Sequence, residues 1–211
     1  FSGDDLRQAE IAADDAALTP WGIATAPGAN AAFVSHSDGT IRRRNLGAGT
    51  AGTIVFDASQ AVCGAGSTTD NNGAKSLDVS GDGKWLVATR SDSAVVVHNL
   101  TDPAKPMCMT LPAPESKTVA FSPDATKLAV LSATDRLYVF DLAQPDAALI
   151  YGAPAVPENS PLAVASGPAR TSSWLAWRDD RTIAIATTAG AVENIVLDAA
   201  AWRARVDTLS I

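Results

Sequence analysis

The feature that most constrains the fold is a series of short apolar segments separated by turn residues. Three such segments follow one another at Lys117–Phe121, Lys127–Leu131 and Leu137–Leu142. They are rich in Val, Leu, Tyr and Phe, which is typical of half-buried strands. The intervening turn, Ser122–Ala125, contains a proline that fixes φ and an aspartate that can bond to the backbone two residues on. The pattern predicts a three-stranded antiparallel meander.

The chain repeats this meander. A comparable turn, Ser80–Gly83, stands about 42 residues before Ser122–Ala125, and landmarks in successive copies are about 42 to 56 residues apart. We expect four copies, at about residues 20–57, 74–111, 116–151 and 172–197. The other expected strands are Trp21–Ala26, Ala31–Ser35, Thr40–Leu46, Thr53–Phe56, Lys84–Thr89, Ala94–Leu100, Met107–Leu111, Ala148–Tyr151, Ser173–Trp177, Thr182–Thr187 and Ala191–Leu197.

The two ends of the chain differ from the repeats. Residues 1–19 are rich in Ala, Glu and Asp, and we expect a short helix or linker there, or alternatively an outer strand that pairs with the fold. Residues 198–211 are expected to form a helical tail, because Asp198 can cap a helix that begins AAAWRARV. Trp202 would dock that helix onto the last repeat or a neighbouring domain. Since the chain starts at Phe1, we expect it to be the C-terminal piece of a longer polypeptide.

Two segments resemble the WD40 repeat. Val119–Asp124 (VAFSPD) is similar to the family's V-x-F-S-P-D-G turn, and Tyr138–Leu142 (YVFDL) to its W-D-L strand end. The resemblance covers about residues 20–197 and implies an all-β fold, a β-propeller or part of one, with four recognisable blades. No copy carries the Trp-Asp pair, so the family's structural Asp–His hydrogen-bond network is expected to be absent. The four slots for that pair hold Arg44-Asn45, His98-Asn99, Phe140-Asp141 and Ile195-Val196.

The tail resembles the end of WD40 arrays in bacterial STAND-type signalling ATPases, in the segment DAAAWRAR from Asp198 to Arg205. In those proteins the propeller is a sensor or scaffold joined to an effector. This chain has no G-x-x-x-x-G-K-[ST] phosphate loop. The resemblance therefore implies a non-catalytic scaffold or sensor module of a larger multidomain bacterial signalling protein.

The charge of the chain narrows the class of partner. Its net charge is −7 and its pI is about 4.7. This acidity disfavours non-specific binding to nucleic acid or anionic membranes, and no apolar run reaches the ~18–20 residues of a membrane helix. We expect a protein partner or another domain of the same polypeptide, with no nucleic acid and no membrane insertion.

Several polar loops are candidate partner contacts, because loops on a rigid scaffold often carry binding. They are Asp38-Gly39, Arg90-Ser91-Asp92, and Asp70-Asn71-Asn72 within the polar stretch 64–73. The basic run Arg42-Arg43-Arg44 could bind a phosphate or an acidic surface, but alternation along a strand would place Arg43 opposite Arg42 and Arg44. We expect the arginines to form a solvated edge.

The two cysteines do not decide whether the protein belongs to a reducing or an oxidising compartment. Cys63 and Cys108 can form one bridge, but two unpaired thiols are the favoured interpretation, in keeping with a cytoplasmic protein. A Cys63–Cys108 disulfide would support the alternative, a secreted or periplasmic propeller enzyme or ligand-binding protein.

No catalytic signature is present, and we expect neither enzyme activity nor a cofactor. The only histidines, His36 and His98, stand at different places in their repeats and are not expected to share a metal. Four tryptophans lie in or beside predicted strands, and core packing is expected for most of them. Trp174 and Trp177 should face opposite ways because an odd number of residues separates them.

Overall fold

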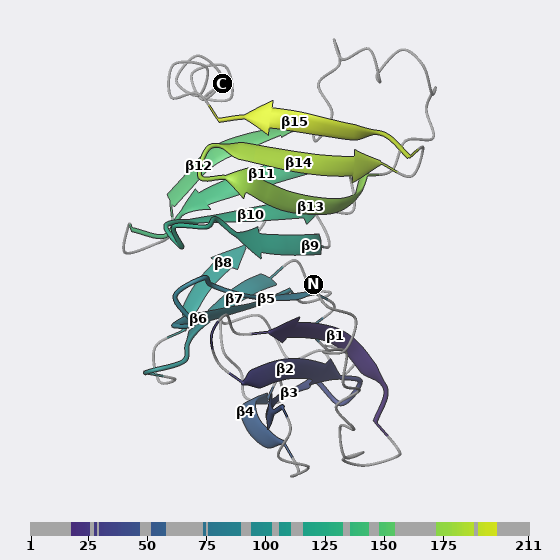
Figure 1. Ribbon diagram of the computed structural model, residues 1–211, viewed down its shortest axis with the longest axis vertical. Coiled ribbons are helices and arrows are strands. Elements are labelled where there is room, and N and C mark those ends of the chain that lie inside the picture. Colours follow the sequence, from purple (N-terminus) through teal and green to yellow (C-terminus); the bar gives the residue numbers. More distant parts are fainter. Residues whose placement is uncertain are drawn as a thin grey trace, which may run out of the picture.

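The chain folds into antiparallel β-sheets (Figure 1). The computed structural model describes residues 18–25, 28, 30–46, 52–57, 74, 76–89, 94–102, 106–110, 116–132, 136–143, 148–154, 172–187 and 190–197. The expected helical tail 198–211, and the N-terminal segment except Leu18 and Thr19, lie outside these residues. The described part contains no helix that is long and apolar enough to cross a membrane.

Four sheets follow one another along the sequence, each a simple meander. The first contains β1 (Pro20–Thr25), β2 (Ala31–His36), β3 (Thr40–Asn45) and β4 (Thr53–Asp57). The second contains β5 (Leu77–Val79), β6 (Trp85–Thr89), β7 (Ala94–Asn99) and β8 (Met107–Thr110). The third contains β9 (Ser116–Phe121), β10 (Lys127–Ser132), β11 (Arg136–Asp141) and β12 (Ala148–Pro154). The fourth contains β13 (Ser172–Asp179), β14 (Thr182–Thr187) and β15 (Val192–Val196).

The expected all-β fold of repeated meanders is confirmed. Every expected strand is present, and its ends differ by at most a few residues. The largest difference is at β12, which continues to Pro154 because it pairs along the whole of β11, up to Arg136. The strand pattern does not specify how the four sheets pack against one another, which depends on tertiary contacts.

The hairpin turns of the second and third sheets use the same side-chain chemistry. Ser80 Oγ donates to Asp82 Oδ1 at 2.6 Å and accepts from the Trp85 amide at 3.0 Å. Ser122 does the same with Asp124 and Lys127, at 2.5 and 2.9 Å. The repeated Ser-x-Asp therefore fixes both turns and sets the register of the strands that follow.

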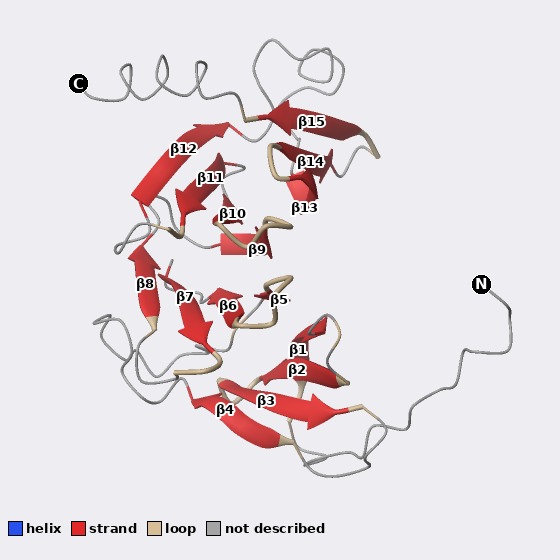
Figure 2. Cartoon of the chain, turned by 60° about the vertical axis from the view of Figure 1, so that its left-hand side comes forward, coloured by secondary structure: helices blue, strands red, loops and turns tan. Residues whose placement is uncertain are grey.

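The first strand of each sheet lies innermost, and the sheets fan outward in an arc (Figure 2). Neighbouring inner strands contact one another: β1 with β5, β5 with β9, and β9 with β13. Among the described residues, no comparable contact joins β1 to β13. Within the described residues, the arc is therefore open on the side between the first and fourth sheets.

A separate apolar core fills each space between successive sheets. Strand alternation sends neighbouring side chains of one strand to different cores. In β10, Leu128 and Val130 pack towards the second sheet, whereas Ala129 and Leu131 pack towards the fourth. Each fully buried Leu or Ile stabilises the fold by about 1.5–3 kcal/mol relative to exposure. Packing of sheet on sheet thus holds the arc together.

Candidate functional site

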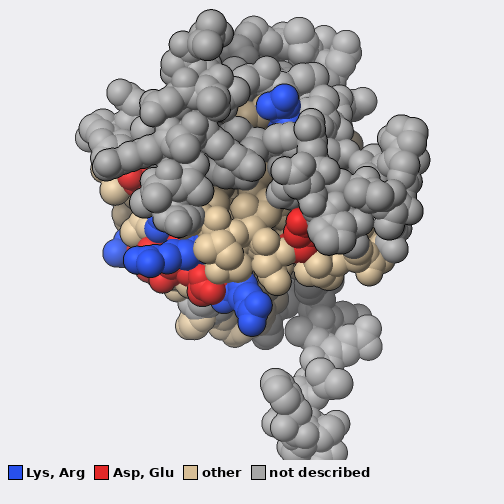
Figure 3. All heavy atoms as spheres, turned by 90° about the horizontal axis from the view of Figure 1, so that it is seen from above, with Lys and Arg blue, Asp and Glu red and all other residues tan. Residues whose placement is uncertain are grey.

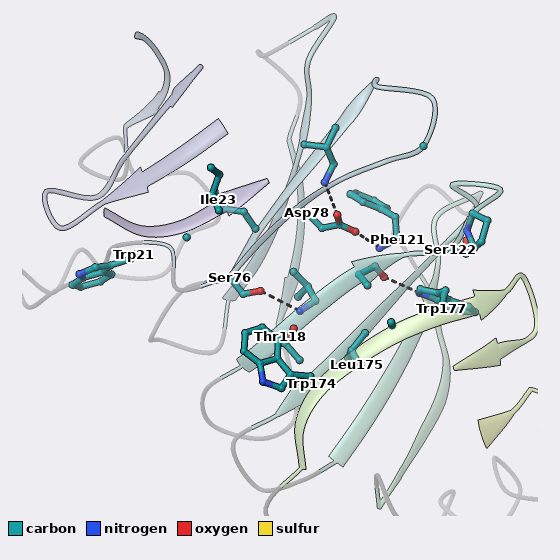
Figure 4. Close-up of a pocket in the computed structure, with 18 residues that line it drawn as sticks. Trp21, Ile23, Ser76, Asp78, Thr118, Phe121, Ser122, Trp174, Leu175 and Trp177 are labelled. Atoms are coloured by element: carbon teal, nitrogen blue, oxygen red, sulfur yellow. Dashed lines mark hydrogen bonds between the residues drawn. The ribbon is translucent and has the colours of Figure 1, made fainter. Parts of the chain in front are cut away.

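The inner strands of all four sheets line one pocket of about 670 Å³ (Figure 4). Its walls combine apolar side chains with a few polar groups. It is the natural candidate site, because concave, largely apolar pockets with a few convergent polar groups are the usual form of a binding site. The residues that matter most for the argument are Trp21 and Ile23 from β1, Asp78 from β5, Thr118 from β9, and Trp174 and Trp177 from β13.

Asp78 is the only carboxylate among the residues that line the pocket, and it joins two sheets. Its Oδ2 accepts a hydrogen bond from the Phe121 amide of β9 at 2.7 Å, and its Oδ1 accepts from the Val79 amide at 2.9 Å. Burial raises the pKa of Asp78, and these two amides oppose the rise. The carboxylate thus accepts hydrogen bonds from backbone amides of two sheets.

Two further side chains connect the inner strands across sheet boundaries. Ser76 Oγ accepts from the Val119 amide of β9 at 3.4 Å. Trp177 Nε1 of β13 donates to the Ala120 carbonyl of β9 at 2.9 Å. Since β9 is an edge strand of its sheet, the Ser76 contact supplies a partner to an amide on the outer side of that strand. The two contacts hold the pocket walls in register.

One end of the pocket is formed by the hairpin turns. The Asp124 amide in the β9–β10 turn donates to Asp180 Oδ1 in the β13–β14 turn at 2.9 Å. Gly81 in the β5–β6 turn stands close to the Pro123 carbonyl, which a Cβ at Gly81 would approach to 3.1 Å. Three turns therefore lie side by side at this rim, and Gly81, Ser122 and Pro123 belong to the pocket lining.

The tryptophans at the pocket correct one expectation. Trp177 is half-buried and packs against the core between the third and fourth sheets. Trp174 is 70% exposed, so core packing was the wrong expectation for it. The register places the two rings on opposite faces of β13, as their spacing predicts. Trp174 faces away from the third sheet, where no described sheet covers it.

The predicted contact residues that the structure describes lie away from this pocket. Asp38 and Gly39 form the β2–β3 turn, in which Gly39 adopts φ +86°. Asp38 Oδ1 accepts from the Thr40 amide at 2.9 Å and from the Thr40 hydroxyl at 2.7 Å. Those bonds show that the Asp-Gly pair stabilises the turn. Neither residue lines the pocket.

Several predicted residues lie outside the described part of the chain. They are Cys63, Asp70, Asn71, Asn72, Arg90, Ser91, Asp92 and Trp202. Their proposed roles in binding, bridging and docking remain predictions.

The arginine run is divided between the two faces of β3. Arg42 pairs with Val34, Arg43 with Phe33 and Arg44 with Ala32, so Arg43 faces opposite to the other two. Arg43 is exposed, whereas Arg44 is buried. On the face drawn in Figure 3, basic and acidic side chains of the described residues lie next to one another. The register of β3 thus divides the three arginines between two faces instead of placing them in one basic patch.

The cysteines give a second correction. Cys108 on β8 is disulfide-bonded, and none of the cysteines in the described residues is free. The expectation of unpaired thiols is therefore wrong for Cys108. The sequence offers a single other cysteine, Cys63, which is outside the described residues.

The two histidines are both buried and lie on different strands, β2 and β7. No group of three or more His, Cys, Asp or Glu side chains suited to a metal occurs among the described residues. Sequence reasoning missed the pocket itself. No sequence pattern distinguishes Asp78, because it alternates with Leu77 and Val79 as any polar residue of a half-buried strand does.

No family model matches the chain, and a search of curated proteins found no significant match.

Proposed function

We propose that the four sheets are blades of a β-propeller, complete or partial, that serves as a non-catalytic protein-binding module. The observation that carries the proposal is that the first strands of all four sheets line one pocket. Radial repetition of four-stranded meanders around a central space is the propeller architecture. The WD40-like segments Val119–Asp124 and Tyr138–Leu142 support the same assignment.

A binding role fits the chemistry of the pocket better than catalysis does. Its one carboxylate, Asp78, accepts two backbone amides and holds two sheets together. The rim, in contrast, presents three hairpin turns on a rigid scaffold, and such loops commonly carry binding. We place the partner contact at this rim, around Gly81 and Pro123.

A substitution at the rim tests the proposal. Pro123 is exposed and lines the pocket, so Pro123→Lys changes the rim without opening a core. A partner captured from the source organism would be purified and titrated calorimetrically. We expect Pro123→Lys to weaken binding by at least about tenfold and the exposed control Asp102→Ala to leave it unchanged. Equal binding by both variants would exclude the rim as the contact.

A larger signalling protein is the context proposed from the tail. The intact mass of the native polypeptide tests it directly. A mass far above 21.6 kDa supports a module of a multidomain protein. A native mass near that value would overturn this part of the proposal and give priority to a self-sufficient ligand-binding propeller.

The bonded Cys108 favours a second candidate, a secreted or periplasmic propeller that binds a ligand. Stable disulfides persist in oxidising compartments and are rare in the cytosol. Alkylation of the native protein followed by peptide mass analysis distinguishes the compartments. If the compartment is oxidising, the Cys108 peptide is alkylated only after reduction. Alkylation of Cys108 without prior reduction would favour a cytoplasmic protein instead.

A further inference from the structure

The fourth sheet ends on a strand that has a further neighbour in each of the other sheets. Its order is β13-β14-β15, whereas the other three sheets continue from their third strand to a fourth. In those sheets β3 pairs with β4, β7 with β8 and β11 with β12, each time antiparallel. Figure 1 shows β15 at the outer edge of its sheet. Within the described residues, β15 therefore has one side along which no strand is paired.

The hydrogen bonds between β15 and β14 show which backbone groups lie on that side. The Leu197 amide donates to the carbonyl of Arg181, the residue opposite it, at 2.7 Å. In an antiparallel pair, residues that bond to the neighbouring strand alternate with residues whose N–H and C=O groups point away from it. The register is regular along β15, so the groups that point outward belong to Val192, Asn194 and Val196.

The side chains of these three residues share one face and are open to solvent. Val192 and Val196 are each 64% exposed, and Asn194 between them is exposed as well. The single charged residue of β15, Glu193, pairs with Ile185 and so lies on the opposite face, which packs on the third sheet. The outward edge of β15 thus combines unpaired backbone groups with an uncharged Val-Asn-Val row.

The outer edges of the other sheets are less regular. A register shift interrupts the pairing of β4 and that of β12, and β8 carries the disulfide-bonded Cys108. Proteins commonly protect their edge strands with bulges, prolines or lysines. β15 contains neither proline nor lysine and pairs with β14 without a bulge. Among the outer edges in the described part of the chain, it is the one best prepared to accept another strand.

The row on β15 is complementary to itself. When two β15 strands pair antiparallel about a twofold axis at Asn194, Val192 lies opposite the partner's Val196, and Asn194 lies opposite the partner's Asn194. The outward N–H groups of one copy then meet outward carbonyls of the other. Glu193 lies opposite the partner's Ile195, so the two carboxylates are not placed directly against each other. The sequence of the strand therefore suits a second copy of the same strand.

We propose that two copies of this chain associate through β15, which pairs antiparallel with the partner's β15 and joins the two fourth sheets into one continuous sheet. The contact is isologous and closes with two copies. It goes beyond the proposed binding at the Pro123 rim and does not depend on it. β13, which lines the pocket, is separated from β15 by β14, so the pairing leaves the pocket and its rim accessible.

Sedimentation equilibrium of the 211-residue chain tests this dimer. One short pair of strands buries less surface than the ~1,200 Å² of a standard stable interface, so we expect a weak association that depends on concentration. The wild-type chain should approach twice its 21.6 kDa mass as its concentration is raised to about 100 µM, at which a micromolar contact is formed.

Substitutions at the twofold axis provide the decisive comparison. Asn194→Lys and Asn194→Asp each place two like charges directly opposite one another and should raise the dimer dissociation constant by more than about tenfold. An equimolar mixture of the two variants pairs Lys with Asp and should restore the dimer. Thr101→Lys adds the same charge at an exposed turn of the second sheet and should leave the wild-type dimer unchanged.

The other outcomes decide against the pairing. Because Asn194 is exposed, both variants should stay folded by circular dichroism. A folded wild-type chain that remains monomeric up to about 100 µM overturns the proposal. It is overturned equally by a dimer that persists in both variants, by a mixture that stays monomeric, or by wild-type oligomers of more than two copies. Partner binding at the Pro123 rim is measured separately, so either proposal can fail without the other.

Discussion

The imidazole ring of His98 on β7 lies against the phenyl ring of Phe56 on β4, with ring centroids 4.3 Å apart and ring planes inclined by 49°. Both residues are buried, and the contact joins the outer parts of the first and second sheets. His98 Nε2 has no hydrogen-bond partner among the described residues. A neutral imidazole is tolerated in such a place, whereas an imidazolium loses its hydration without compensation.

Stability should therefore fall as pH is lowered through the range in which His98 titrates. Burial lowers the pKa of His98 from 6.5 to about 4. The unfolded chain takes up the proton below pH 6.5, but the folded chain does so only near pH 4. The stabilisation is complete above pH 6.5 and is lost between 6.5 and 4, by about 3 kcal/mol in all.

Urea unfolding from pH 7 to pH 5 measures this slope, and His98→Leu is the matched variant. It keeps an apolar contact with Phe56 and removes the titrating group. We expect a flatter dependence of the unfolding free energy on pH in the variant. Identical slopes in the two proteins would contradict the assignment of the pH dependence to His98.

Removal of the Asp78 carboxylate should destabilise the fold. Asp78→Ala leaves the partly buried Phe121 amide without its 2.7 Å acceptor, and we expect a loss of about 1–3 kcal/mol in the free energy of unfolding. Ser76→Ala removes the longer, 3.4 Å contact to Val119 and should cost less. Chemical denaturation of both variants at pH 7 gives the comparison. An Asp78→Ala variant as stable as wild type would contradict the bridging role.

The two repeated turns provide a backbone test. Gly83 and Ala125 occupy equivalent positions with φ of +71° and +57°. An L side chain is strained there, so Ala125→Gly should raise the free energy of unfolding by about 0.5–1 kcal/mol. Gly83→Ala should lower it by a similar amount, since nothing lies within 4 Å of the added Cβ and only the backbone conformation counts. Melting temperatures that move together in the two variants would refute the equivalence.

The indole hydrogen bond between the third and fourth sheets is also testable. Trp177→Phe keeps an aromatic side chain but removes the Nε1 donor to the Ala120 carbonyl. We expect a loss of about 1 kcal/mol in stability. Relative to wild type, amide hydrogen exchange in the variant should accelerate more in β13 and β14 than in β6. The reason is that the fourth sheet loses a hydrogen bond to the third. Uniform acceleration in all four sheets would contradict a local tie.

The sequence by itself determined the strands and their turns. Period-2 apolar runs bounded by Ser-x-Asp or Asp-Gly specify a meander locally, and the structure places strands at all the expected positions. Arginine alternation on β3 and the opposed tryptophans of β13 followed from the same periodicity. These properties depend only on neighbours along one strand or one hairpin.

Only the tertiary structure decided what those strands enclose. Asp78 and Phe121 are 43 residues apart, as are Ser76 and Val119, and no local pattern brings them together. The exposure of Trp174 likewise depends on whether a further sheet packs beside the fourth, which alternation within β13 cannot specify. The pocket exists because four sheets turn their first strands inward, and the packing of one sheet face on the next sets that orientation.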